Sequence, residues 1–145
     1  MGIAPVADTH GLDTGDPDAA GGSIDAWRAA AASAVGRIAR SIVVTLGSAG
    51  AVAAASDGSW IAAAPRVEAV DTTGAGDGFT GALAAMLAEG RPLDEALRVA
   101  VAAGALAVQA RVTVDSYAGR EAVLRAAGLD SARAVRRDPE AEGDA

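Results

Sequence analysis

The sequence predicts a layered α/β fold in which helices cover a small sheet. Residues 41–46 form a near-continuous, largely β-branched run, as expected for a strand that is covered on both faces. Two further strand-like runs are joined through Asp57-Gly58, a pair that favours a tight turn. Stretches of helical length and periodicity flank this group on both sides along the chain.

The first helix is predicted from about Ile24 to Ala39 or Arg40. Ser23 is a good N-cap residue, and Asp25 is favourable in the first turn. Apolar side chains recur at helical spacing along this segment, and we expect them to face a sheet: Ile24, Trp27, Ala31, Val35 and Ile38. The strand at residues 41–46 follows, and residues 47–50 turn the chain.

A hairpin is predicted next, with strands at residues 51–55 and 60–64 joined across residues 56–59. Pro65 should end its second strand. A short strand-like run from Arg66 to Val70 then leads into a loop that contains glycine. This loop should therefore lie at the carboxyl end of a strand, where open α/β sheets place ligands.

The remaining elements are helices at about residues 77–88, 93–110 and 120–127. Gly90 should cap the C-terminus of the first of these helices, and Pro92 should mark the start of the second. Gly128 should end the third. Residues 112–117 are expected to be irregular or a short extension. We divide the chain into an acidic flexible head (residues 1–23), a folded body (24–128) and a polar tail (129–145).

Composition excludes several classes of function. The formal net charge of −7 argues against a nucleic-acid partner or an anionic membrane surface. No apolar run approaches the ~20 residues that a membrane span needs. The absence of cysteine fits a reducing compartment, so we expect a cytoplasmic protein. Aromatic residues make up only 3%, so the core must be built from Ala, Val and Leu.

The central motif is the loop Asp71-Thr-Thr-Gly-Ala-Gly-Asp77, which opens onto a long apolar run. Gly74 and Gly76 carry no Cβ, so an anion can approach the backbone closely. Free N–H groups and the positive dipole end of the following helix make this loop an anion site. In a passive anion site the Asp77 charge would be repulsive. Its presence favours a base that accepts a proton from a hydroxyl attacking a phosphoryl group.

This loop resembles the C-terminal signature of the ribokinase-like sugar kinases, the PfkB family. Upstream, Thr45-Leu-Gly-Ser-Ala-Gly50 resembles the nucleotide-site turn of the same family. The resemblance extends from about Gly11 to the region of Leu124 and covers the C-terminal half of such a kinase. It implies a ribokinase-like three-layer α/β/α (Rossmann-like) fold with a β-hairpin, without the N-terminal substrate half and its lid.

The resemblance also implies site residues. Asp77 would be the catalytic base, and the N–H groups of Gly74, Ala75 and Gly76 would form the anion hole. Asp71 and Thr73 match positions that hold a monovalent cation such as K⁺ in relatives. The positions matching the ATP contacts are Thr45, Gly47, Ser48 and Gly50. The implied reaction transfers the γ-phosphate of ATP, with Mg²⁺, to a hydroxyl of a small sugar or nucleoside.

Some features depart from the family pattern. The Asn-x-x-Glu magnesium motif expected just before Gly11 is absent, since residues 2–5 read Gly-Ile-Ala-Pro. Val112 stands where the family typically has a glycine that supports the cation site. Two alternatives to an active kinase therefore stay open: a truncated, inactive fragment, and a module that binds a phosphate or a partner without turnover. An exposed half-domain surface would also favour self-association.

A dinucleotide site is a rival interpretation, because Gly76-Asp-Gly-Phe-Thr-Gly81 spells G-x-G-x-x-G. Asp77 would then face a pyrophosphate, and the helix after the motif leads into another helix rather than a second strand. We therefore reject this interpretation. A Walker A loop is absent, because the sequence has no Gly-Lys-Ser/Thr.

Overall fold

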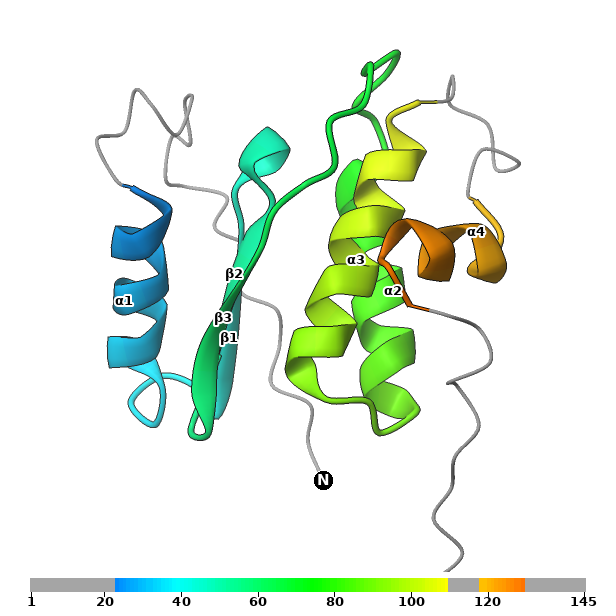
Figure 1. Cartoon of the computed structure of the whole chain (residues 1–145). Coiled ribbons are helices and arrows are strands. Elements are labelled where there is room, and N and C mark those ends of the chain that lie inside the picture. The colour runs from blue at the N-terminus through cyan, green and yellow to red at the C-terminus, as the bar shows by residue number, and fades with distance from the viewer. Residues whose placement is uncertain (1–22, 110–117, 130–145) are drawn as a thin grey trace, which may run out of the picture.

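The computed structural model describes residues 23–109 and 118–129 (Figure 1). The predicted head and tail lie outside these residues apart from Ser23 and Leu129, as do residues 112–117. The elements are α1 (Ile24–Ala34), β1 (Ser41–Thr45), the 3₁₀-helix η1 (Gly47–Ala49), β2 (Ala51–Ala55), β3 (Gly58–Ala62), α2 (Ala75–Ala88), α3 (Leu93–Ala107) and α4 (Arg120–Ala126).

The strands form one antiparallel sheet in the order β1-β2-β3. Helix α1 covers one face of this sheet, and α3 covers the other with α2 packed beside it (Figure 1). Helix α4 lies against α3, on the side away from the sheet. The predicted α/β fold with helices on both faces of the sheet is confirmed.

The central strand β2 separates two apolar clusters because its side chains alternate between the two faces. Val52 and Ala54 pack with Ala31 of α1 on one face. Ala51 and Ala53 belong to the cluster of α2, α3 and α4 on the other face, which includes the fully buried Leu97. Every buried side chain in the described residues is apolar. Small alanines in β2 allow the helices to approach the sheet closely.

The predictions for the first helix and strand need correction. Helix α1 ends at Ala34, because Val35 takes an extended conformation and Gly36 has a φ of 79°. Ile38 consequently lies beyond the helix and is 79% exposed rather than facing the sheet. Strand β1 is half-buried, since it is an edge of this sheet, and β2 is the strand covered on both faces.

The hairpin and the run after it also differ from the prediction. Ala55 pairs directly with Gly58, so the turn consists of Ser56 and Asp57 alone, and β3 spans Gly58–Ala62. The run from Arg66 to Val70 forms no strand. Its only described backbone bond is made by the Val70 N–H to the carbonyl of Val108, in the turn after α3. The loop that contains Gly74 and Gly76 therefore follows an irregular linker rather than a paired strand.

The predicted helix ends mostly hold. The Ser23 hydroxyl accepts a hydrogen bond from the Ala26 N–H at 3.2 Å, which confirms the N-cap. Gly90 and Gly128 both adopt positive φ, and the following N–H groups bond back to Met86 and Leu124 as expected for glycine C-caps. Helix α3 stops at Ala107, and a turn follows.

None of the helices in the described parts of the chain is long and apolar enough to cross a membrane.

Candidate functional site

The first turn of α2 presents free backbone donors. Gly74 precedes the helix with a φ of 84°, a left-handed conformation that glycine adopts without strain. Gly78 donates to the Gly74 carbonyl at 2.9 Å, and Ala75 donates to Thr72 at 3.3 Å. Between them, the N–H groups of Gly76 and Asp77 form no hydrogen bond within the described residues. They remain available to an anion at the positive end of the helix.

The base of the loop is fixed by backbone and side-chain bonds. The Asp71 carboxylate accepts the Thr73 N–H at 2.8 Å, which closes a tight turn. The Val108 carbonyl accepts two N–H groups, from Val70 at 2.8 Å and from Asp71 at 3.1 Å. The loop is therefore held against the C-terminal end of α3 and not by a sheet.

A cavity of about 480 Å³ lies between η1, the linker after β3, the start of α2 and the end of α3. We call it the η1–α2 cavity. It brings together predicted site residues from distant parts of the sequence: Thr45, Gly47, Ser48 and Gly50 from the first motif, and Ala75 and Gly76 from the second. Gly74, Asp77, Asp71 and Thr73 do not line it.

The other walls of the η1–α2 cavity were not predicted. Phe79 of α2 and Val101, Ala105 and Val108 at the end of α3 give it an apolar side. Gly104 lets the two helices approach, since a Cβ there would lie 3.2 Å from the Ala75 carbonyl oxygen. The sequence does contain a signal for these walls. The helix predicted at residues 93–110 is apolar almost all round, so it has more apolar surface than packing against a sheet alone requires. Arg66, in the linker, also lines the cavity.

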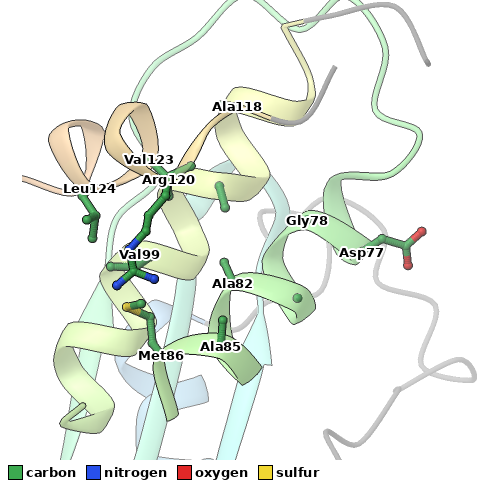
Figure 2. Close-up of a pocket in the computed structure, with 12 residues that line it drawn as sticks. Asp77, Gly78, Ala82, Ala85, Met86, Val99, Ala118, Arg120, Val123 and Leu124 are labelled. Atoms are coloured by element: carbon green, nitrogen blue, oxygen red, sulfur yellow. The ribbon is translucent and has the colours of Figure 1, made fainter. Parts of the chain in front are cut away.

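Asp77 lies on the opposite side of this turn. It is exposed and borders a second, mostly apolar hollow of about 410 Å³ between α2, α3 and α4. We call this hollow the α4 groove. Figure 2 shows the Asp77 carboxylate pointing away from the other labelled side chains of the groove. The groove is lined by Asp77, Gly78, Gly81, Ala82, Ala85, Met86, Val99, Ala103, Ala118, Arg120, Val123 and Leu124.

The cation of the α4 groove is already paired. Arg120 donates two hydrogen bonds to the Glu89 carboxylate, at 2.6 and 2.7 Å, and ties α4 to the C-terminal end of α2. This hydrogen bond lowers the pKa of Glu89 and raises the pKa of Arg120. The Arg120 guanidinium is therefore already hydrogen-bonded to a carboxylate, and an anionic ligand would have to compete with Glu89 for it.

Metal-binding potential among the described residues is limited. No group of three or more His, Cys, Asp or Glu side chains that could hold a metal ion occurs in residues 23–109 or 118–129. Asp71 and Thr73 offer oxygen donors, which suit hard cations. Their hydrogen bond keeps these two residues together at the base of the loop.

Comparisons with known proteins agree with this arrangement. The family model described as pfkB family carbohydrate kinase matches residues 14–118. Ribokinase of Arabidopsis thaliana is 46% identical over 61 residues, which is 42% of this chain and 16% of the relative. The chain thus spans well under half the length of the relatives it matches.

Solved structures give the same result. Phosphofructokinase-2 of Escherichia coli in complex with potassium matches with a TM-score of 0.65 and 32% identity, over 73% of this chain and 34% of that one. Arabidopsis thaliana ribokinase complexed with ribose and ATP matches with a TM-score of 0.64 and 32% identity, over 74% and 35%. Together with the family match over most of the folded body, these similarities place the chain in the pfkB family of carbohydrate kinases.

Proposed function

We propose that this chain carries the nucleotide-binding and catalytic half of an ATP-dependent phosphotransferase. The γ-phosphate of ATP would pass to a hydroxyl group of a small sugar or nucleoside. The observation that supports this most is the pair of unbonded N–H groups, on Gly76 and Asp77, at the start of α2. Gly76 lines the η1–α2 cavity, while the Asp77 carboxylate is exposed on the other side of the same turn.

ATP would occupy the η1–α2 cavity. Its apolar side, formed by Val101, Ala105 and Val108, suits the base. The segment from the end of β1 through η1 offers the hydroxyls of Thr45 and Ser48 and the backbone of Gly47 and Gly50. The Arabidopsis ribokinase with a similar fold was solved with ATP and ribose, which supports a nucleotide in this chain. The phosphates would extend toward the N–H groups of the loop.

The loop would then perform the chemistry. Gly74, Ala75 and Gly76 would form the anion hole, in which fixed N–H groups stabilise charge that develops on the phosphoryl group, each typically contributing about 3 kcal/mol. The Ala75 N–H would have to exchange its 3.3 Å bond to the Thr72 carbonyl for the phosphoryl oxygen. Asp77 would accept the proton of the attacking hydroxyl from the open side of the turn. In a loose phosphoryl-transfer transition state the proton is removed late, so even a weak base suffices.

Two cations are part of the proposal. The described residues contain no acidic cluster, so Mg²⁺ would be held chiefly by the nucleotide phosphates, as is common for this ion. K⁺ would bind at the oxygens of Asp71 and Thr73, and a similar phosphofructokinase-2 structure contains potassium. Held beside the loop, it would add positive charge next to the anion hole.

A specific observation favours a second candidate, a nucleotide-binding module without turnover. Beyond Asp77 and Arg120, the α4 groove is lined by apolar residues and glycines, so the described residues form no polar pocket for a sugar. Such a chain would bind ATP in the η1–α2 cavity but transfer no phosphate. The two candidates differ in turnover, not in binding.

The first test is a thermal melt of the purified chain with and without Mg-ATP. Ligand that binds the native state alone raises the melting temperature, by mass action. A transition that does not move with ATP at millimolar concentration would contradict both candidates.

The second test is the variant Asp77→Asn, with Asp57→Asn in the exposed hairpin turn as the matched control. Loss of a general base typically costs about 10²- to 10⁴-fold in rate. We expect phosphoryl transfer to a panel of sugars and nucleosides to fall by that factor in Asp77→Asn and to persist in Asp57→Asn. ATP binding, measured by titration calorimetry, should persist in both. Equal turnover in the two variants would remove Asp77 from the mechanism.

We also propose a cytoplasmic location and self-association through exposed apolar surface. Ile38, Ile61 and Val70 are the exposed large apolar side chains of the described residues. A sedimentation-velocity run over a range of concentrations tests the association, and a single monomeric species throughout would contradict it.

A further inference from the structure

The η1–α2 cavity contains an unassigned cation. Among the described residues that line it, Arg66 is the one charged side chain. It follows Pro65 in the irregular linker between β3 and α2. The sequence pattern predicts a strand that begins at this residue, whereas in the structure it belongs to the linker and borders the cavity.

Arg66 differs from the paired arginines. Arg28, Arg91 and Arg120 form ion pairs with Asp25, Glu95 and Glu89, respectively. Arg66 forms no ion pair or hydrogen bond within the described parts of the chain. Since it also borders a cavity, its charge is available to whatever binds there.

The electrostatic need for such a charge is clear from the rest of the site. The chain has a net charge of −7, contains no lysine, and places Asp77 at the same helix turn that presents the N–H donors. Backbone dipoles alone would have to hold a polyanion against this negative field. A guanidinium forms strong, charge-assisted hydrogen bonds to phosphate oxygens and suits this role better than any neutral side chain.

We propose that Arg66 binds the phosphate chain of the nucleotide in the η1–α2 cavity. This inference rests on the proposed function, because it takes the ligand of the cavity to be a nucleotide. Alternatively, the guanidinium could stack against the base of the nucleotide. A phosphate contact predicts that loss of Arg66 weakens binding of ATP and tripolyphosphate, whereas stacking predicts weaker binding of ATP and adenosine. Arg66 would be a binding residue and would take no part in proton transfer.

The test compares Arg66→Ala and Arg66→Lys with Arg98→Ala by titration calorimetry. Arg98 is exposed on α3, has no described ion pair and lines neither the cavity nor the groove, so it controls for the loss of one positive charge. Each protein is titrated with ATP, with adenosine and with inorganic tripolyphosphate. Melting temperatures are recorded alongside, and since Arg66 is exposed we expect no change in them.

We expect Arg66→Ala to weaken ATP and tripolyphosphate binding roughly 5- to 20-fold, as for the loss of a charged hydrogen bond. Adenosine binding should not change. Arg66→Lys should restore part of the loss, and the salt dependence of ATP binding should be weaker in Arg66→Ala than in Arg98→Ala.

Other outcomes separate the two proposals. If the wild-type chain binds ATP and Arg66→Ala behaves like Arg98→Ala, the role of Arg66 is wrong while the nucleotide site stands. Equal weakening of ATP and adenosine would move Arg66 to the base and overturn the phosphate contact. If the wild type binds tripolyphosphate through Arg66 but not ATP, the nucleotide function fails and the anion role of Arg66 stands. Binding of neither ligand would refute both.

Discussion

The first turn of α2 has a hollow on each side, and the two differ in the state of their arginine. In the η1–α2 cavity Arg66 has no partner in the described residues, and the adjacent N–H of Gly76 is unbonded. In the α4 groove Arg120 is tied to Glu89 by two short hydrogen bonds. The two hollows have similar volumes and mostly apolar walls. They differ in whether their arginine already has a carboxylate partner, and so in how readily they could bind an anion.

An arginine that lines a hollow therefore indicates an anion site only when its own hydrogen-bond and ion-pair partners are also known. A guanidinium already paired with a carboxylate acts as a connection between elements, here between α4 and the end of α2. An unpaired one is available to a ligand. Glycines also differ between the two sides. Gly50 and Gly104, which line the cavity, allow a close approach of backbone atoms, whereas a Cβ added at Gly81 in the groove would meet no atom within 4 Å.

The largest effect is expected at Gly50, on the cavity side. It has a φ of 108°, and a Cβ there would lie 2.0 Å from the Ala62 carbonyl oxygen. Gly50→Ala should destabilise the fold by more than about 3 kcal/mol, because backbone atoms must move. Urea unfolding measures this. The control is Gly36→Ala, which has positive φ but open space and should cost about 1–2 kcal/mol. Equal losses in the two variants would show that the contact with Ala62 does not matter.

A smaller effect of opposite sign is expected at Gly81, on the groove side. This glycine lies inside α2, and an added Cβ would meet no atom within 4 Å. Gly81→Ala should stabilise the protein by about 0.5–1 kcal/mol, since alanine has the higher helix propensity. Urea unfolding again provides the measurement. A loss of stability would contradict the open space around Gly81.

The smallest effect concerns the pairing of Arg120 with Glu89. The Arg120 hydrogen bond lowers the pKa of the folded-state carboxyl below its ordinary value. Its stabilisation is therefore present above the unfolded pKa, near 4.5, and is lost as the pH falls through the folded value. Both groups are exposed, so the effect should be slight.

Melting temperatures from pH 7 to pH 3 measure this effect in Glu89→Gln. The variant should melt slightly below the wild type at neutral pH, and the difference should shrink as the pH falls below about 4.5. Glu68→Gln, an exposed linker residue without a described ion pair, should show no such convergence. A difference that stays constant with pH would mean that the ion pair is not its cause.

Local signals in the sequence predicted local structure well. Helix ends are marked by Ser23, Gly90 and Gly128. The Ser23 side chain accepts a backbone N–H, and the positive φ of the two glycines lets the chain turn so that following N–H groups reach the last carbonyls. The loop around Gly74 and Gly76 could likewise be identified as the start of a helix, and α2 begins at Ala75. Each of these features is formed by residues only a few positions apart, so a short stretch of sequence is enough to predict it.

The predictions that failed were those that depend on contacts between residues far apart in the sequence. The alternation from Arg66 to Val70 is compatible with a strand, but a strand also needs a neighbour, and the Val70 N–H instead bonds to a carbonyl after α3. Ile38 continues the helical spacing of α1, yet Gly36 has already ended the helix. The position of Arg66 at the η1–α2 cavity was missed for the same reason, because the linker lies beside η1 and α2 only in the folded chain.

The Val108 carbonyl accepts the N–H groups of both Val70 and Asp71, so a movement of this carbonyl away from the loop would break both bonds together. Neither amide can exchange its hydrogen with solvent unless that carbonyl releases it. The exchange rates of these two amides should therefore rise and fall together. A ligand that holds the loop in place would slow both at once, at positions that it does not touch.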